Sequence, residues 1–534
     1  MNNLRILDVT LRDGGCVNNF NFGQTYMERI LAAQEAAGID IIEIGYIDEN
    51  KGSVKGRTQY INEKVIPQCI LKNKKSNIKY VVMIDYGKFD IDKLEPRNDK
   101  GIDGIRLAFH KKDRFNIIDI GKKILALGYE FYIQPMVTLR YTDAELLELI
   151  DLVNKELPDA SGFYIVDSFG EMRANDMNRV LNLVDHNLIS SMTLGFHSHN
   201  NLQMSYSNSI AMIQFETTRN MIIDSSIMGM GKGAGNLNTE IFVEHLNLFY
   251  GKNYNISPLL QVIDEVINPI HSEMYWGYSV EYYLSAINHC TPSYASYFYN
   301  KNMLPINQLS SLLESIAPHK KVSFDQKYAE ALYISFNEKN SVDDTETVCE
   351  LKKVFSNKLV LLIAPGKSIN NHINKINALI ADPNIISIGL NVIDRNADYV
   401  MTTRKEIFDM AIVNNFNVIT TSNVFIEKKE RINVLNYKDW IITKDRVIDS
   451  SFAVIGKLLK EVGVKKMLLA GFDGFQTDIN LNYYSDIMRR PIIPNQVEIN
   501  NQMNKYIVEF LREAGIELEF VTPSIYEMRG GDNR

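Results

Sequence analysis

Residues 7–15 read Leu7-Asp8-Val9-Thr10-Leu11-Arg12-Asp13-Gly14-Gly15, an apolar segment that ends in an arginine, a carboxylate and two glycines. The apolar run Leu4–Val9 predicts a buried strand. In α/β folds, charged side chains and flexible backbone at the C-terminal end of a strand are typical of an active site. We therefore expect Asp13 to bind a metal ion and Arg12 to bind an oxyanion.

From residue 4 to about 250, short apolar runs alternate with longer amphipathic segments, and this rhythm predicts the fold. Eight strands are expected, at Leu4–Val9, Ile39–Ile44, Tyr80–Ile84, Gly104–Ala108, Glu130–Pro135, Gly162–Val166, Met192–Phe196 and Met221–Asp224. Eight strands alternating with helices over about 250 residues match an α/β fold of the (β/α)₈ TIM-barrel type. An open doubly wound sheet is the alternative, but the number of strands and the polar residues that follow them favour the barrel.

The other predicted strand ends carry further candidate residues, because the active sites of barrels lie at this face. Glu43 lies in the second strand, Arg106 and His110 lie at the fourth, and Ser168 follows the sixth. Glu43 is expected to orient Arg12, to transfer protons, or to serve only as a buried salt-bridge partner. Arg106 and Ser168 are candidates for binding the substrate together with Arg12.

His197 and His199 follow the seventh predicted strand. In extended backbone, residues i and i+2 point to the same side, so both imidazoles can reach one ion. With Asp13 they form a mixed nitrogen and oxygen ligand set that leaves positions open for water or substrate. The alternative is a pair of hydrogen-bonded histidines at a strand end.

A glycine-rich segment, Gly229-Met230-Gly231-Lys232-Gly233-Ala234-Gly235-Asn236, follows the eighth predicted strand. It lacks the spacing of a phosphate-binding loop. We expect either a turn that needs positive φ angles or a mobile flap, and Asn236 is a candidate to supply an amide oxygen to the metal.

Three motifs, in this order along the chain, resemble those of the DRE-TIM metallolyases. They are Asp8-x-Thr10-Leu11-Arg12-Asp13-Gly14, His197-x-His199-Asn200 and Gly229-x-Gly231-x-Gly233-Ala234-Gly235-Asn236. That superfamily includes 4-hydroxy-2-oxovalerate aldolase, hydroxymethylglutaryl-CoA lyase, isopropylmalate synthase and homocitrate synthase, and the resemblance covers about residues 1–275.

The resemblance implies a divalent cation, Mg²⁺ or Mn²⁺, on Asp13, His197 and His199, with Asn236 as a further ligand or a loop contact. It also implies metal-dependent aldolase chemistry, in which a carbon–carbon bond forms or breaks through the enolate of a 2-oxo acid such as pyruvate. The substrates would be a 2-oxo acid and an aldehyde, or an acyl-CoA if the reaction is a Claisen condensation as in the synthases. A divalent ion and a fixed guanidinium stabilise the charge of an enolate better than water does.

One position departs from the family pattern and leaves the general base open. In the oxovalerate aldolases a histidine lies three residues after the aspartate of the first motif, whereas this chain has Cys16 there. The synthases carry an acidic residue and a glutamine after the glycine, where this chain has Gly15 and Cys16. Cys16, His110 and Tyr46 are the candidates for proton transfer, although a neutral thiol is a poor base.

Beyond the barrel, expected at 1–251, residues 252–340 predict a helical extension and residues 346–534 predict a Rossmann-like α/β domain. The segment Gly366-Lys367-Ser368 is not a Walker loop, because Leu361 replaces the first glycine and Pro365 removes an N–H donor. Ser368 is expected to cap the next helix.

This C-terminal half weakly resembles sialyltransferase-like and flagellin-modification accessory domains, through Ala364-Pro365-Gly366-Lys367-Ser368 and Gly471-Phe472-Asp473-Gly474-Phe475. The resemblance implies binding of a nucleotide or nucleotide sugar and a role in making surface glycans. A domain used for oligomerisation is the alternative.

Composition limits the partners and the compartment. The net charge of −8 gives no general attraction to nucleic acid or to anionic membranes. The four cysteines (Cys16, Cys69, Cys290 and Cys349) are scattered, so neither a disulfide framework nor a zinc knuckle is expected. Neither a signal segment nor a membrane span is apparent, and we expect a cytoplasmic enzyme that forms a homo-oligomer.

Overall fold

The structure is a computed structural model that describes residues 4–52, 54–66, 70–72, 74–301, 304, 306–393, 396–427, 429–443, 447–485 and 494–527. The chain forms two compact units. The first comprises residues 1–296 and 317–324, and the second comprises residues 297–316 and 325–534. Cys69, one of the four cysteines, lies outside the described residues.

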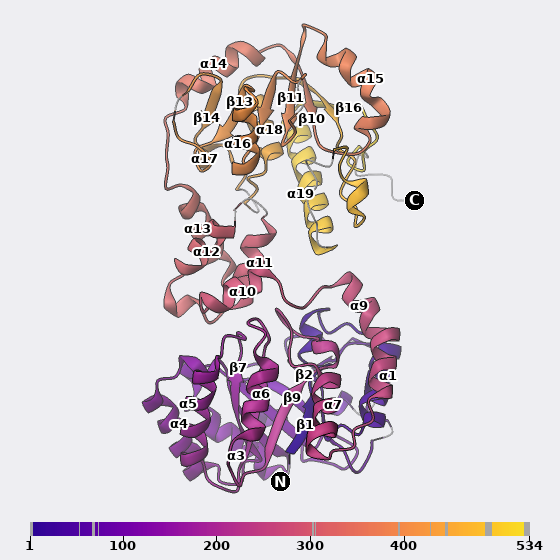
Figure 1. Ribbon diagram of the computed structural model, residues 1–534, viewed down its shortest axis with the longest axis vertical. Helices are drawn as coiled ribbons and strands as arrows, with labels where there is room; N and C mark the ends of the chain where they lie inside the picture. The colour runs from indigo at the N-terminus through magenta and orange to yellow at the C-terminus, as the bar shows by residue number, and fades with distance from the viewer. Residues whose placement is uncertain are drawn as a thin grey trace. The chain divides into compact units, whose positions relative to one another are not determined.

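The first unit is built on a closed barrel of eight parallel strands (Figure 1). The strands are β1 (Leu4–Asp8), β2 (Ile41–Ile47), β4 (Lys79–Asp85), β5 (Gly104–Phe109), β6 (Glu130–Pro135), β7 (Gly162–Asp167), β8 (Thr193–Ser198) and β9 (Met221–Ser225). Strand β1 pairs with both β9 and β2, and these pairings close the barrel. The predicted (β/α)₈ barrel is therefore confirmed over the open sheet. A two-residue strand, β3 (Gln59–Tyr60), pairs with β2 in addition and was not predicted.

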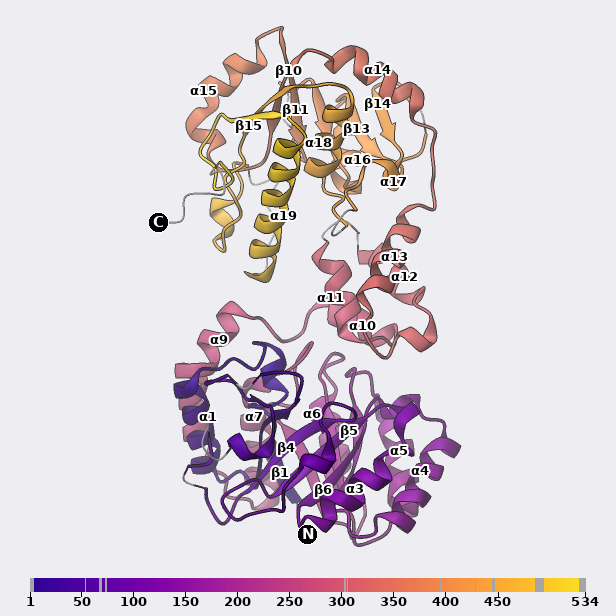
Figure 2. The same cartoon turned by 180° about the vertical axis from the view of Figure 1, so that it is seen from behind.

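Helices cover the outside of the barrel, as the views from both sides show (Figure 2). They are α1 (Gln24–Ala37), α3 (Ile117–Ala126), α4 (Asp143–Glu156), α5 (Ala174–Asn187), α6 (Ser205–Gln214) and α7 (Thr239–Tyr250). Thr142 caps α4 in a capping box with Glu145, and Gly38 ends α1 in a left-handed conformation.

Strand β5 shows why charged residues lie inside this barrel. Ile105, Leu107 and Phe109 pack in the core shared with the outer helices, so the alternation of the strand turns Arg106 toward the barrel interior. Deeper in the barrel, the interior is filled by an apolar cluster of Leu7, Val9, Ile41, Val81, Tyr132, Tyr164, Val166 and Ile222. The polar residues are thus gathered near the C-terminal ends of the strands.

The predicted extension is helical. It contains α8 (Ser257–Val262), a π-helical turn (Ile263–Ile267), α9 (Asn268–Glu273), α10 (Val280–Ile287), α11 (Pro292–Asn300), α12 (Ile306–Glu314) and α13 (Gln326–Asn337). Residues up to 296 belong to the barrel unit, and most of the later residues of the extension belong to the second unit.

The second unit contains a seven-stranded, fully parallel sheet in the order β14-β13-β12-β11-β10-β15-β16. The strands are β10 (Leu359–Ile363), β11 (Ile385–Leu390), β12 (Tyr399–Met401), β13 (Val418–Thr421), β14 (Ile432–Leu435), β15 (Lys466–Ala470) and β16 (Glu517–Phe520). The chain order reverses between β10 and β15, which makes this the topological switch point of a doubly wound sheet.

The helices of this unit cover both faces of its sheet. They are α14 (Thr345–Phe355), α15 (Ile369–Ile380), α16 (Lys405–Val413), α17 (Tyr437–Trp440), α18 (Ser451–Glu461) and α19 (Pro494–Glu513). Helix α15 packs on one face through Ile369 and Ile376, and α18 and α19 pack on the other face.

The prediction that Ser368 caps α15 is wrong. Ser368 occupies the N-cap position, but its side chain makes no capping hydrogen bond. Its hydroxyl and its backbone N–H both donate to Asp473, which lies in the loop after β15. A charged acceptor from another loop therefore replaces the local cap. Among the described residues, no helix combines the length and apolar character needed to cross a membrane.

Candidate active site at the barrel mouth

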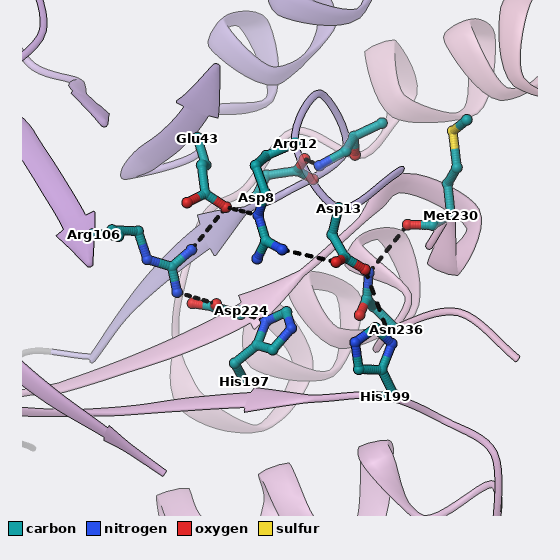
Figure 3. Close-up of polar contacts among 11 residues, drawn as sticks. Asp8, Arg12, Asp13, Glu43, Arg106, His197, His199, Asp224, Met230 and Asn236 are labelled. Atoms are coloured by element: carbon teal, nitrogen blue, oxygen red, sulfur yellow. Dashed lines mark hydrogen bonds and ion pairs between the residues drawn. The ribbon is translucent and has the colours of Figure 1, made fainter. Parts of the chain in front are cut away.

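Asp13, His197 and His199 come together at the C-terminal end of the barrel (Figure 3). All three are buried, and one ligand atom from each lies within 4.8 Å of the others. Asp13 lies in a tight turn after β1, in which its N–H donates to the carbonyl of Val9 at 2.8 Å. The structure thus brings together the three residues that the sequence assigned to one ion.

Asn236 completes this group. Its amide nitrogen donates to Asp13 Oδ2 at 2.8 Å and to the carbonyl of Met230 at 3.1 Å. Asn236 Oδ1 and His199 Nδ1 are both buried, and neither atom has a hydrogen-bond partner among the described residues. Buried polar atoms that lack a hydrogen-bond partner within the protein are expected to bind a water molecule or an ion. Imidazole nitrogens with carboxylate and amide oxygens form a donor set that suits a divalent cation.

The charges of the group agree with such a site. Burial lowers the pKa of His199 to about 4, so its imidazole is neutral and able to bind a metal. Burial opposes ionisation of Asp13, but His199 and Arg12 together hold its pKa below the usual range. Asp13 is therefore an anionic ligand at neutral pH.

An alternating chain of charges joins Arg12 to His197, and we call it the ionic chain (Figure 3). Arg12 Nε donates to Glu43 Oε2 at 2.6 Å, and Arg106 Nη1 lies 2.9 Å from the same oxygen. Arg106 Nη2 donates to Asp224 Oδ2, which also lies 2.9 Å from His197 Nδ1. Because Asp224 accepts at Nδ1, the other ring nitrogen of His197 is left for a metal.

Arg12 keeps one unused donor. Its Nη1 donates to Asp13 Oδ1 at 2.8 Å, while its buried Nη2 has no hydrogen-bond partner in the part of the chain that the structure describes. The Arg12 side chain as a whole is about one-tenth exposed. This N–H is available to an oxyanion, in line with the expected role of Arg12.

Arg106 is fully buried beneath this surface. Its guanidinium lies 4.7 Å from the ring centre of Tyr164, and Gly195 leaves the space that this ring needs, since a Cβ there would lie 2.4 Å from it. With its amide oxygen turned inward, Gln134 accepts from Arg106 Nη2 at 3.1 Å and from Nε at 3.2 Å. This placement favours a positioning role, and the substrate contact of Arg106 stays a prediction.

Ser168 supports a turn at the rim. Its hydroxyl accepts the backbone N–H of Val137 at 2.9 Å. Val137 has φ of 54°, which is a strained conformation for a β-branched residue. The predicted contact of Ser168 with substrate stays a prediction.

The candidates for proton transfer lie around a carboxylate that was not predicted, Asp85 at the end of β4. Burial raises the pKa of Asp85, which forms a hydrogen bond with Tyr46 and feels the charges of Arg12 and His110. The Cys16 side chain is exposed, yet desolvation by the surrounding protein and the negative charge of Asp13 raise its pKa to about 12. Burial and Asp85 raise the pKa of Tyr46 as well.

These pKa values decide which group suits proton transfer near neutral pH. Cys16 and Tyr46 are both protonated there, which makes them weak bases, and a carboxylate with a raised pKa is better matched. The roles predicted for Cys16 and His110 remain predictions. Sequence reasoning missed Asp85, and it missed Asp224 as a site residue. The available signal was an acidic residue closing an otherwise apolar strand.

The glycine-rich segment 229–236 is a turn built on positive φ, with Gly229 at 61°, Gly233 at 69° and Gly235 at 82°. Gly231 is needed for a different reason. A Cβ there would lie 2.3 Å from Asn236 Nδ2 and 2.7 Å from Asp13 Oδ2. The absence of a side chain therefore lets the segment approach the carboxylate.

Contacts from elsewhere in the barrel unit hold this segment. Asn201, which is fully buried, accepts the N–H of Ala234 at 2.9 Å. Trp276, from the helical extension, donates its indole N–H to the carbonyl of Met228 at 3.0 Å. The extension therefore stabilises the loop that carries Asn236.

Comparison with known proteins identifies relatives of the barrel. The family model described as HMGL-like matches residues 3–266. The chain is similar to 4-hydroxy-2-oxovalerate aldolase of Carboxydothermus hydrogenoformans, with 31% identity over 278 residues that cover 50% of this chain and 77% of the relative. The enzyme of the same name from Shewanella pealeana is 28% identical over 272 residues, which cover 49% of this chain and 76% of the relative. The chain is also similar to a solved structure, the N-terminal domain of a putative aldolase from Bacteroides vulgatus, with 26% identity and a TM-score of 0.47. The match covers 55% of this chain and 96% of that domain.

Proposed function

Because the chain belongs to the HMGL-like family, we propose that its barrel is a divalent-metal-dependent carbon–carbon lyase, an aldolase that cleaves a 4-hydroxy-2-oxo acid. The observation that carries this proposal is the buried cluster of Asp13, His197 and His199 beside the unused N–H of Arg12. The names of the relatives support the substrate class, since they are 4-hydroxy-2-oxovalerate aldolases.

Asp13, His197 and His199 would hold Mg²⁺ or Mn²⁺, with Asn236 turned to offer its oxygen. When bound, the cation supplies a Lewis acid that polarises the 2-oxo group and stabilises negative charge on its oxygen. Arg12 adds a fixed donor to that oxygen, and Glu43 and Asp13 hold the guanidinium in place through bonds of 2.6 and 2.8 Å.

In the cleavage direction, loss of the 4-hydroxyl proton turns that carbon into an aldehyde as the C3–C4 bond breaks. The electron pair of the bond forms the enolate of pyruvate, and a proton added to C3 completes the methyl group. We assign both proton transfers to Asp85, because its pKa is raised by burial and it lies at the rim near Arg12.

The test measures pyruvate release from 4-hydroxy-2-oxovalerate by the full chain, coupled to lactate dehydrogenase. Activity is expected to disappear in excess chelator and to return with Mg²⁺ or Mn²⁺. Asp13→Ala and His199→Ala should abolish it, whereas His186→Ala, on the outer helix α5, should not. Full turnover in excess chelator would contradict the proposal. Release of free thiol from acetyl-CoA with a 2-oxo acid, without aldol cleavage, would indicate a synthase instead.

A further inference from the structure

The C-terminal unit contains a cavity of about 270 Å³ that the barrel chemistry does not involve. Its walls are the segments that follow β10, β11, β12 and β15, together with residues of α16, α18 and α19. It therefore lies at the carboxyl ends of the strands, beside the switch point between β10 and β15. Open parallel sheets bind their ligands at this place. The volume is near the lower end of the about 300–1,000 Å³ typical of small-molecule sites.

Four charged side chains line the cavity, the cations Lys301 and Arg404 and the carboxylates Glu406 and Asp473. Asp473 accepts from Ser368, and the charge of Arg404 is only partly compensated. Its side chain is 14% exposed, and Nη2 donates to Glu406 Oε1 at 2.9 Å. Nε is buried and has no hydrogen-bond partner among the described residues. Burial lowers the pKa of Arg404 to about 10, as expected of a guanidinium that has lost water without gaining a full set of anionic partners. An anionic group in the cavity would supply what is missing.

Aromatic and amide side chains line other parts of the cavity. Phe475 and Tyr483 are half-buried at its wall, and Tyr483 lies close enough to Arg404 to interact with it electrostatically. Asn500 and Asn504 also line it, whereas the amide of Asn482 at the same wall is bonded at both ends to the backbone of Gln476. Aromatic side chains favour contact with a flat, unsaturated group, and amides favour a ligand with several hydrogen-bonding edges.

The glycines of these loops are explained without a ligand. A Cβ on Gly366 would lie 2.3 Å from the carbonyl oxygen of Gly471, and a Cβ on Gly471 would lie 2.2 Å from that of Ala364. These glycines let the loops after β10 and β15 pass each other closely. They do not indicate a phosphate cradle. Of the two cations that line the cavity, Lys301 donates to the carbonyl of Val447 and lies over the rings of Tyr297 and Tyr333. Arg404, with its unused N–H, is therefore the group that recognises the anion.

We propose that this cavity binds a nucleoside monophosphate, with the phosphate on Arg404 and the base against Phe475 and Tyr483. An anion and a flat heterocycle on one small ligand match Arg404, the aromatic side chains and the amides that line the cavity. The volume suits a mononucleotide better than a dinucleotide. The site is independent of the aldolase reaction proposed for the barrel.

The test is calorimetric titration of the full chain with AMP, GMP, CMP and UMP, and in parallel with inorganic phosphate and the four nucleosides. At least one monophosphate should bind, and should do so more tightly than phosphate or its own nucleoside. Arg404→Gln should weaken that binding about tenfold or more. Lys405→Gln, at an exposed neighbour that pairs with Asp409, is the matched control and should leave the affinity unchanged.

Glu406→Gln provides a change of the opposite sign, because it removes the carboxylate that competes with the ligand for Arg404. Glu406→Gln should tighten the binding of the monophosphate. If circular dichroism shows that Arg404→Gln does not fold, the result for Glu406→Gln tests the role of Arg404 instead. The proposal is overturned if no monophosphate binds at millimolar concentration, or if inorganic phosphate binds as tightly as the nucleotides. It is equally overturned if folded Arg404→Gln keeps the wild-type affinity, or if Glu406→Gln fails to tighten binding.

Discussion

Asp224→Asn should weaken the binding of a divalent metal although Asp224 is not itself in the proposed ligand set. Asp224 Oδ2 lies 2.9 Å from Nδ1 of His197 and also accepts from Arg106. The carboxylate therefore fixes both the tautomer and the orientation of His197. Asparagine has nearly the same shape, but it has no charge, and its NH₂ group accepts from neither neighbour.

The expected size of the effect can be worked out from these contacts. Both contacts go to the same oxygen, so the amide oxygen of asparagine can still accept them, but without a negative charge. The loss is therefore expected to be about that of one charge-assisted hydrogen bond. Such a bond contributes about 1.5–3 kcal/mol. At about 1.4 kcal/mol per factor of ten, the loss corresponds to an about 10- to 100-fold weaker metal affinity. Loss of the outer carboxylate of a metal-bound histidine has effects of this size in other proteins.

In the assay, the full chain is treated with chelator to remove metal, and its affinity for Mn²⁺ is then measured by isothermal titration calorimetry. Asp185→Asn is the matched control, because Asp185 also accepts from a buried arginine, Arg219, but at the outer helices. It should leave the metal affinity unchanged. The reasoning is refuted if Asp224→Asn folds, with a melting temperature near that of Asp185→Asn, and binds Mn²⁺ as tightly as the wild type.

Four further predictions concern single residues. Glu43→Gln should lower kcat/KM about 10- to 100-fold while leaving the metal affinity within a few-fold, as steady-state kinetics and Mn²⁺ titration will show, because it loosens Arg12. Asp85→Asn should lower kcat about 10²- to 10⁴-fold. In the wild type, kcat should fall as the pH drops through the raised pKa of Asp85, and the pH profile of the variant should lack this limb. Gly231→Ala should lower both the melting temperature and kcat, since its Cβ would lie 2.7 Å from a carboxylate oxygen of Asp13. Burial raises the pKa of Asp8 to about 6, so its contribution to stability is present below about pH 4 and is lost as the pH rises through 6. Urea denaturation should show a loss of about 3 kcal/mol over that range in the wild type and less in Asp8→Asn.

The barrel could be predicted because its signals are local. Each strand is a short apolar run that ends in a polar residue, and His197 and His199 lie two positions apart at such an end. Pairing these histidines with Asp13 required only the assumption that all strand ends meet at one rim.

The ionic chain could not be predicted, because it depends on register and on contacts across the barrel. Arg106 binds Asp224, which lies 118 positions away in the sequence, and the sequence around either residue gives no indication of this pairing. Ser368 shows the same limit, since the local pattern predicts a helix cap but Asp473, 105 residues away, binds the serine instead. Strand β3 has only two residues, which are too few for a periodic signal.

The division of the chain between its two compact units bears on how such a protein can arise and be taken apart. The path of the chain passes from one unit to the other after residues 296, 316 and 324. No single cut separates the units, and a fragment ending at residue 251 would also lack Trp276 and its bond to Met228. Each unit is therefore made of more than one segment of the chain, and the units do not simply follow one another in the sequence. A graft or gene fusion that moves one of them intact must carry residues 317–324 together with the barrel.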